Sequence, residues 1–290
     1  MTEVVCILRR DCLLGEGPCW DERSGRLYWV DIKGCAIEFF CPGSGNHRRF
    51  RLEAQPSGLA TRGDGTLIVA CDRGCAIFEP ESGALLSRWS IEECRLQNRC
   101  NDAKTDSLGR FWVGTMHDAE KESTGALYCI SADRNARRVL DNTGISNTLA
   151  WSPDDTKFYF ADSRIQTIFV FDFDKRTAHL SNRRVFATTL GQSMSPDGSA
   201  MDCEGYLWNA QWGGGRVVRY APDGQISRII ALPVSQPTSC AFGGPGLSTL
   251  YITSARIGLD PRQLAREPLA GSIFAVDAGI GGLPVPDFAG

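Results

Sequence analysis

Histidine is scarce in this chain of 290 residues, which contains only three, at positions 47, 117 and 179. No two of them have the short spacing of a metal-binding motif, and none of the 12 cysteines forms a Cys-x-x-Cys pair. These absences argue against a zinc module built from cysteine and histidine. We therefore expect reduced cysteines that pack as small apolar residues, and not a disulfide framework.

Long apolar runs are also lacking. No stretch approaches the roughly 18 apolar residues of a membrane-spanning helix, and the first residues, MTEVVCILRRDC, lack the continuous apolar segment of a secretory signal. The formal net charge of −3 shows no basic excess of the kind that nucleic-acid binders carry. The sequence therefore predicts a cytoplasmic monomer with neither nucleic-acid nor membrane partners.

A sixfold repeat of a turn followed by a strand-like segment dominates the chain. The copies lie at residues 24–32, 64–72, 108–116, 155–163, 204–212 and 247–255. Each begins near Gly, Asp or Ser, which favour turns, and continues with aromatic and aliphatic residues, which favour strands. Six units of about 40 to 50 residues are typical of a β-propeller, whereas a β-sandwich, the alternative, would have no such long period.

The sequence thus predicts an all-β protein, a single six-bladed β-propeller domain over residues 1–290. The apolar segment 4–8 is expected to complete the last blade and so to cover an exposed strand edge. The repeated Trp29, Trp112 and Trp208 are expected to pack between blades.

Residues with side-chain oxygens recur about 10 to 12 positions before an anchor residue in each repeated segment: Glu16, Ser57, Asn101, Asn147, Asp197 and Thr238. The innermost strands of a propeller line its central channel, so these side chains are expected to converge on the axis. Carboxylates and amides together suit a divalent cation such as Ca²⁺, Mg²⁺ or Mn²⁺. The alternative is that they only cap strand ends.

Four motifs resemble the gluconolactonase/regucalcin-like family of sugar lactonases. They are LGEGP at 14–18, NRCND at 98–102, SNTLAWSPD at 146–154 and PDG at 196–198. The resemblance extends over essentially the whole chain, and GTMH at 114–117 and GALY at 125–128 add to it. The segments PLAG at 268–271 and Gly213-Gly214 look most like bacterial aldonolactonases, including xylonolactonases.

The resemblance implies roles for individual residues. Glu16, Asn147 and Asp197 would bind one divalent metal ion (Ca²⁺, Zn²⁺, Mn²⁺ or Fe²⁺), and Asp197 would also be the catalytic general base. Arg99 would bind substrate oxygens, and Asn101 would bind substrate and could also bind the metal. His117 is a further candidate for substrate binding, and the alternative for it is a histidine that is only exposed at the surface. Some family members have a glutamate that contacts sugar hydroxyls four residues before the glycine of GALY, but here that position is Lys121, between Glu120 and Glu122.

The implied reaction is metal-dependent hydrolysis of an aldonolactone, for example a pentonolactone such as xylono- or arabinonolactone, to the aldonic acid. Two alternatives use the same oxygen ligands. One is a calcium-binding regulatory protein without catalytic activity, and the other is a phosphotriesterase or aryl-esterase.

Overall fold

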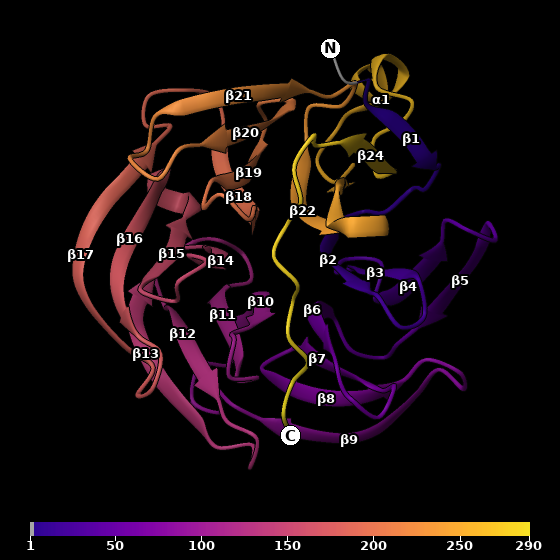
Figure 1. Ribbon diagram of the computed structural model, residues 1–290. Helices are drawn as coiled ribbons and strands as arrows, with labels where there is room; N and C mark the ends of the chain where they lie inside the picture. Colours follow the sequence, from indigo (N-terminus) through magenta and orange to yellow (C-terminus); the bar gives the residue numbers. More distant parts are fainter. Residues whose placement is uncertain (1–2) are drawn as a thin grey trace.

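The computed structural model, which describes residues 3–290, is built from six four-stranded antiparallel sheets around a central axis (Figure 1). The predicted all-β, six-bladed propeller is confirmed. Blade 1 is β2 (Gly15–Asp21), β3 (Arg26–Asp31), β4 (Ala36–Cys41) and β5 (Asn46–Arg51). Blade 2 is β6 (Pro56–Thr61), β7 (Leu67–Cys71), β8 (Gly74–Glu79) and β9 (Ala84–Ser90). Blade 3 is β10 (Asn98–Thr105), β11 (Phe111–His117), β12 (Gly125–Ile130) and β13 (Ala136–Thr143).

The remaining blades follow the same plan. Blade 4 is β14 (Ser146–Trp151), β15 (Lys157–Asp162), β16 (Thr167–Asp174) and β17 (His179–Thr188). Blade 5 is β18 (Ser195–Met201), β19 (Leu207–Trp212), β20 (Arg216–Tyr220) and β21 (Ile226–Ala231). Blade 6 combines β22 (Pro237–Gly243), β23 (Thr249–Ser254) and β24 (Ile273–Asp277) with β1 (Val5–Leu8).

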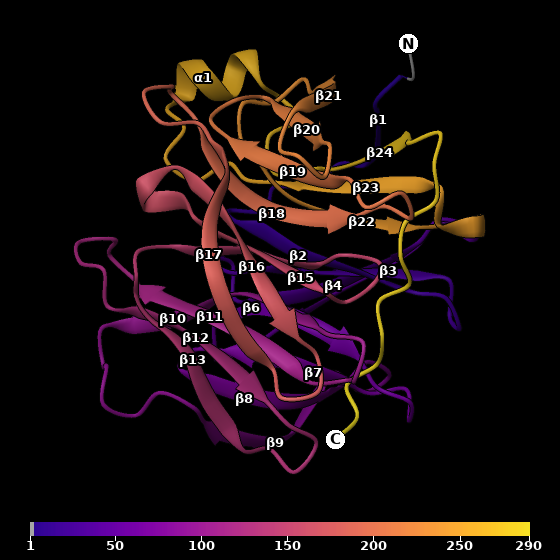
Figure 2. The same cartoon turned by 60° about the vertical axis from the view of Figure 1, so that its left-hand side comes forward.

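Hydrogen bonds near both ends of the chain hold the blades of the ring together. Strand β1 pairs antiparallel with β24 and forms the outer strand of blade 6. After β24 the chain crosses the face of the ring as the yellow segment of Figure 1, and Figure 2 shows it on the side away from the short helix α1 (Pro261–Arg266). Its amides at Leu283, Phe288 and Ala289 donate to carbonyls of Met201, Thr61 and Gly109, which belong to three different blades.

The repeated tryptophans lie in the core between blades. Trp29, Trp112 and Trp208 are fully buried. Nε1 of Trp112 donates to Asp106 at 2.7 Å, and Nε1 of Trp208 donates to Asp202 at 2.8 Å. Each aspartate lies six residues before its tryptophan, so a repeated Asp–Trp pair satisfies the indole N–H without water.

Two further features bear on earlier expectations. All 12 cysteines are free, and most are buried or half-buried. Among residues 3–290, no helix has the length and apolar character needed to cross a membrane.

Candidate functional site

Five of the predicted site residues line one cavity of about 270 Å³: Glu16, Arg99, Asn101, Asn147 and Asp197. They come from the innermost strands β2, β10, β14 and β18, and all are buried. The repeat positions therefore bring together side chains from four of the six blades.

A local irregularity of the inner strands helps to aim these side chains. The pairing with the second strand of the blade shifts register directly after Glu16 and Asn147, and across Asn101 and Asp197. Such bulges bend a strand and redirect the adjacent side chains. At Gly198 a Cβ atom would clash with the side chain of Ser239, so only glycine fits beside Asp197 in this bulge.

The other two repeat positions do not reach the cavity. The hydroxyl of Ser57 donates to the carbonyl of Ala70 at 3.3 Å, and that of Thr238 donates to the carbonyl of Gly15. Both side chains thus bind neighbouring backbone. This matches the alternative to convergence on the axis, in which such residues only satisfy backbone groups at strand ends. The expected convergence of six side chains is correct for four.

Glu16 and Asp197 are carboxylates buried close to each other, and neither forms an ion pair with lysine or arginine within the described residues. Burial, and next the charge of Asp102, raise the pKa of Glu16 to about 8. Burial, and next the charge of Glu16, raise the pKa of Asp197 well above its ordinary range. Two buried, mutually repelling carboxylates favour binding of a cation.

Asn147 supplies a neutral oxygen beside these carboxylates. Its Nδ2 donates to Oγ of Ser163 at 2.8 Å, and its Oδ1 accepts from Nδ2 of Asn101 at 2.9 Å. The amide is therefore oriented with its oxygen on the side of the other site residues. Two carboxylates and an amide oxygen form a donor set that fits a hard divalent cation.

Arg99 is held by hydrogen bonds on two sides. Its Nε donates to Asp118 at 2.8 Å, and its Nη1 donates to Oδ1 of Asn101 at 2.6 Å and to the carbonyl of Cys100 at 2.9 Å. These contacts keep the guanidinium at the cavity wall, where it can bind oxygen atoms of a ligand.

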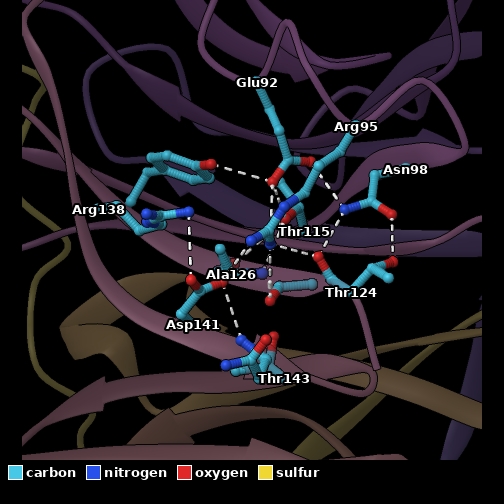
Figure 3. Close-up of polar contacts among 12 residues, drawn as sticks. Glu92, Arg95, Asn98, Thr115, Thr124, Ala126, Arg138, Asp141 and Thr143 are labelled. Atoms are coloured by element: carbon cyan, nitrogen blue, oxygen red, sulfur yellow. Dashed lines mark hydrogen bonds and ion pairs between the residues drawn. The ribbon is translucent and has the colours of Figure 1, made fainter. Parts of the chain in front are cut away.

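A buried glutamate supports the segment that leads into β10. Figure 3 shows Glu92 within a polar network of blade 3. It accepts from Nδ2 of Asn98 at 3.0 Å, from Oγ1 of Thr115 at 3.1 Å and from the hydroxyl of Tyr128 at 3.0 Å. The network joins the start of β10 to β11 and β12, and so fixes the strand that presents Arg99.

The structure does not bring His117 into the cavity. Its Nδ1 accepts from the amide of Ala119 at 3.1 Å, while the preceding residue, Met116, lines the cavity instead. Glu120 also lines the cavity and Lys121 does not. Arg164 donates to the carbonyls of both residues and holds this loop in place.

Several lining residues were not predicted, among them Lys33, Glu120, Ser163 and Trp212. The position of the substrate-binding glutamate in some family members corresponds to Lys121. It therefore indicated the correct loop, but the residue that lines the cavity is the neighbouring Glu120. The repeat does carry a signal for two of them, because Ser163 and Trp212 end the copies 155–163 and 204–212 just as Met116 ends the copy 108–116, and all three line the cavity. No repeat or motif marks Lys33, which lies in the turn after β3.

A second cluster of possible metal ligands lies in and beside blade 1. It consists of Cys12, Asp31 and Glu38, whose ligand atoms lie within 4.8 Å of one another and could contact one ion. Arg49 already pairs with Glu38 at 2.5 Å and with Asp31 at 3.1 Å, and Arg10 pairs with Glu38 at 2.9 Å. These cations neutralise the carboxylates, so the central cavity is the better cation site.

A second cavity of about 270 Å³ lies further along the same inner strands, next to the C-terminal segment. Its lining is mainly apolar and includes Trp151, Met201, Phe242 and Leu283. It holds none of the predicted ligands.

Comparison with known proteins places these observations in context. Residues 14–256 match the family described as the SMP-30/Gluconolactonase/LRE-like region. The chain is 37% identical to regucalcin of Sus scrofa, with 99% of each chain covered, and 37% identical to L-arabinolactonase of Azospirillum brasilense, with 96% and 92% covered. Among solved structures it resembles regucalcin of Agrobacterium tumefaciens, described as a calcium-binding protein, with TM-score 0.91, 31% identity and coverage of 96% and 95%.

Proposed function

Because the chain belongs to the SMP-30/gluconolactonase/LRE-like family, we propose that it hydrolyses the ester bond of a sugar lactone with the help of one bound divalent cation. The observation that carries this proposal is the make-up of the central cavity. It combines Glu16 and Asp197, two buried carboxylates without ion-pair partners among the described residues, with Arg99 and Asn101 at the wall. A purely structural polar cluster would not leave two buried acidic groups to repel each other.

Glu16, Asn147 and Asp197 would hold the cation, which supplies Lewis acidity toward the lactone carbonyl when it is bound. Arg99 and Asn101 bind the hydroxyl oxygens of the sugar and so orient the ring. Asp197 takes a proton from the attacking water at a carboxylate oxygen. The water oxygen bonds to the acyl carbon and the ring ester bond breaks. The leaving ring oxygen takes back the proton from Asp197 and becomes a hydroxyl, and the new carboxylic acid loses its proton to solvent, which yields the aldonate.

For the substrate we propose a pentonolactone, such as arabinono- or xylonolactone. The 37% sequence identity to an L-arabinolactonase, over 96% of this chain, supports this choice. The cavity also suits a small, oxygen-rich ring, because Arg99, Lys33 and Glu120 present polar groups beside the apolar Met116 and Trp212.

A pH-stat assay tests the proposal directly. Metal-free protein is incubated with Ca²⁺, Zn²⁺, Mn²⁺ or Fe²⁺ in turn and assayed on pentono- and hexonolactones, an aryl ester and a phosphotriester. We expect rapid hydrolysis of at least one lactone and little turnover of the other two classes. Absence of lactone turnover with every cation would refute the proposal, and faster turnover of the phosphotriester or aryl ester would support that alternative instead.

A calcium-binding protein without catalytic activity is a second candidate, favoured by the likeness to the Agrobacterium tumefaciens regucalcin. That function needs the carboxylates but neither Arg99 nor the surrounding cavity. Tight Ca²⁺ binding by titration calorimetry combined with no turnover in the lactone assay would establish it.

A further inference from the structure

Asp118 connects two cations that belong to different blades. It follows β11 of blade 3, and its Oδ1 accepts from Nζ of Lys33 at 2.6 Å and from Nε of Arg99 at 2.8 Å. Lys33 lies in the turn after β3 of blade 1. Both cations line the central cavity, whereas Asp118 itself is not among the lining residues. The Asp118 side chain is 44% exposed, so its carboxylate joins the two cations from the solvent side, outside the cavity lining.

The hydrogen bonds of this group leave donors available at the wall. A guanidinium has five N–H donors, and an ammonium has three. Arg99 uses Nε and Nη1 for Asp118, Asn101 and the Cys100 carbonyl, and within residues 3–290 its Nη2 has no acceptor. Lys33 donates to Asp118 alone in the same part of the chain. The donors that remain can bind oxygens of a ligand in the cavity.

We infer that Asp118 is a positioning residue, which holds Arg99 and Lys33 side by side so that their remaining N–H groups bind the oxygens of the lactone and of its carboxylate product. This inference rests on the proposed function. Without the carboxylate, two like charges at one wall would repel each other and turn toward solvent. A guanidinium fixed at Nε and Nη1 presents Nη2 in a defined direction, which favours binding over a freely rotating side chain.

The charges fit this arrangement. Burial raises the pKa of Asp118, but the hydrogen bond from Lys33 and the charge of Arg99 outweigh it and hold the pKa below its ordinary range. Two cations and one carboxylate leave this wall with one net positive charge. Such a wall selects a ring rich in oxygen acceptors, and it favours a product that gains a negative charge.

Asp118→Asn tests the inference, and the chain offers a matched control. Asp172 on β16 also accepts from a lysine and an arginine, Lys157 at 2.7 Å and Arg184 at 2.8 Å, and it lies away from the cavity. We expect D118N to raise KM for the lactone about three- to tenfold, with kcat changed less than about twofold. D172N should leave both constants unchanged. Lys33→Met, which keeps the pair between Arg99 and Asp118, should raise KM by a smaller factor.

The Arg99→Ala background separates positioning from a general structural effect. If Asp118 acts through Arg99, D118N should raise KM in the wild-type background and change it little in R99A. An unchanged KM in D118N, or an equal increase in both backgrounds, would overturn the inference. Should D118N not fold, Asp118→Glu and Lys33→Met carry the same comparison. A wild-type protein inactive on every lactone would refute the proposed function, whereas an active one with an unresponsive KM would refute only the role of Asp118.

Discussion

Ser163 accepts a hydrogen bond of 2.8 Å from Nδ2 of Asn147, and its own hydroxyl donates to the carbonyl of Pro196 at 2.5 Å. One serine therefore orients the amide of blade 4 and also contacts the residue before Asp197 in blade 5. Groups that orient a ligand side chain contribute to metal affinity without touching the ion.

The first prediction concerns this serine. Ser163→Ala removes the acceptor that orients Asn147, so the amide can rotate and cation affinity should fall by about tenfold. Titration calorimetry on the metal-free protein measures the change. Ser152→Ala is the control, because the hydroxyl of Ser152 binds Asp154 in an exposed turn. Equal cation affinities of Ser163→Ala and the wild type would contradict the role of Ser163.

The second prediction concerns the proposed base. Asp197→Asn should lower kcat by about 10²- to 10⁴-fold, because the amide cannot take a proton from water. The same change removes one of two repelling buried carboxylates, so the metal-free variant should melt at or above the wild-type temperature. Activity within tenfold of wild type, after verified metal loading, would exclude Asp197 as the base.

Removal of the metal gives a third prediction, which separates the two candidate cation sites. Chelation should abolish lactone hydrolysis, and re-addition of the cation should restore it and raise the melting temperature, because the ion binds only the folded state. Glu16→Gln should lose this thermal shift, whereas Glu38→Gln should retain it. The reverse pattern would place the ion in the cluster of Cys12, Asp31 and Glu38.

The fourth prediction concerns the dependence of stability on pH. Burial raises the pKa of Glu38, but the hydrogen bond from His47 and the charges of Arg10 and Arg49 outweigh it and lower the pKa below its ordinary value. A lowered pKa contributes stability that is present above the unfolded-state pKa, near 4.5, and that is lost as the pH falls through the folded-state pKa.

Glu38→Gln should therefore cost about 2 kcal/mol of unfolding free energy at pH 7, since it leaves the half-buried cations Arg10 and Arg49 without their partner. The difference from wild type should shrink as the pH falls through the folded-state pKa of Glu38, below which Glu38 is itself protonated. Urea unfolding at pH 7 and at a series of lower pH values measures it, and a difference that stays constant over the whole series would contradict the ion-pair account.

The sequence repeat predicted the ring and four members of the site because each blade is built the same way around the axis. Glu16, Asn101, Asn147 and Asp197 occupy equivalent places on inner strands, so periodicity alone locates them. The family resemblance then singled out Arg99, which the repeat does not mark.

Other features of the site depend on details that the repeat does not encode. Successive side chains on a strand point to opposite faces, so His117 points away where Met116 lines the cavity. In the loop after β11 a shift of one residue puts Glu120 at the cavity in place of Lys121. Lys33 and Asp118 meet only because blades 1 and 3 are folded together, 85 residues apart in the chain.

The proposed cation ligands come from blades 1, 4 and 5, so no single blade or adjacent pair contains the site. A bound ion would link blades 1, 4 and 5 at the axis of the ring. It would add attraction between blades that belong to separate sheets. Moving blade 1, 4 or 5 away from the other two would then cost the binding free energy as well. Amide hydrogen exchange in β2, β14 and β18 should slow together when the cation is added, as one cooperative unit.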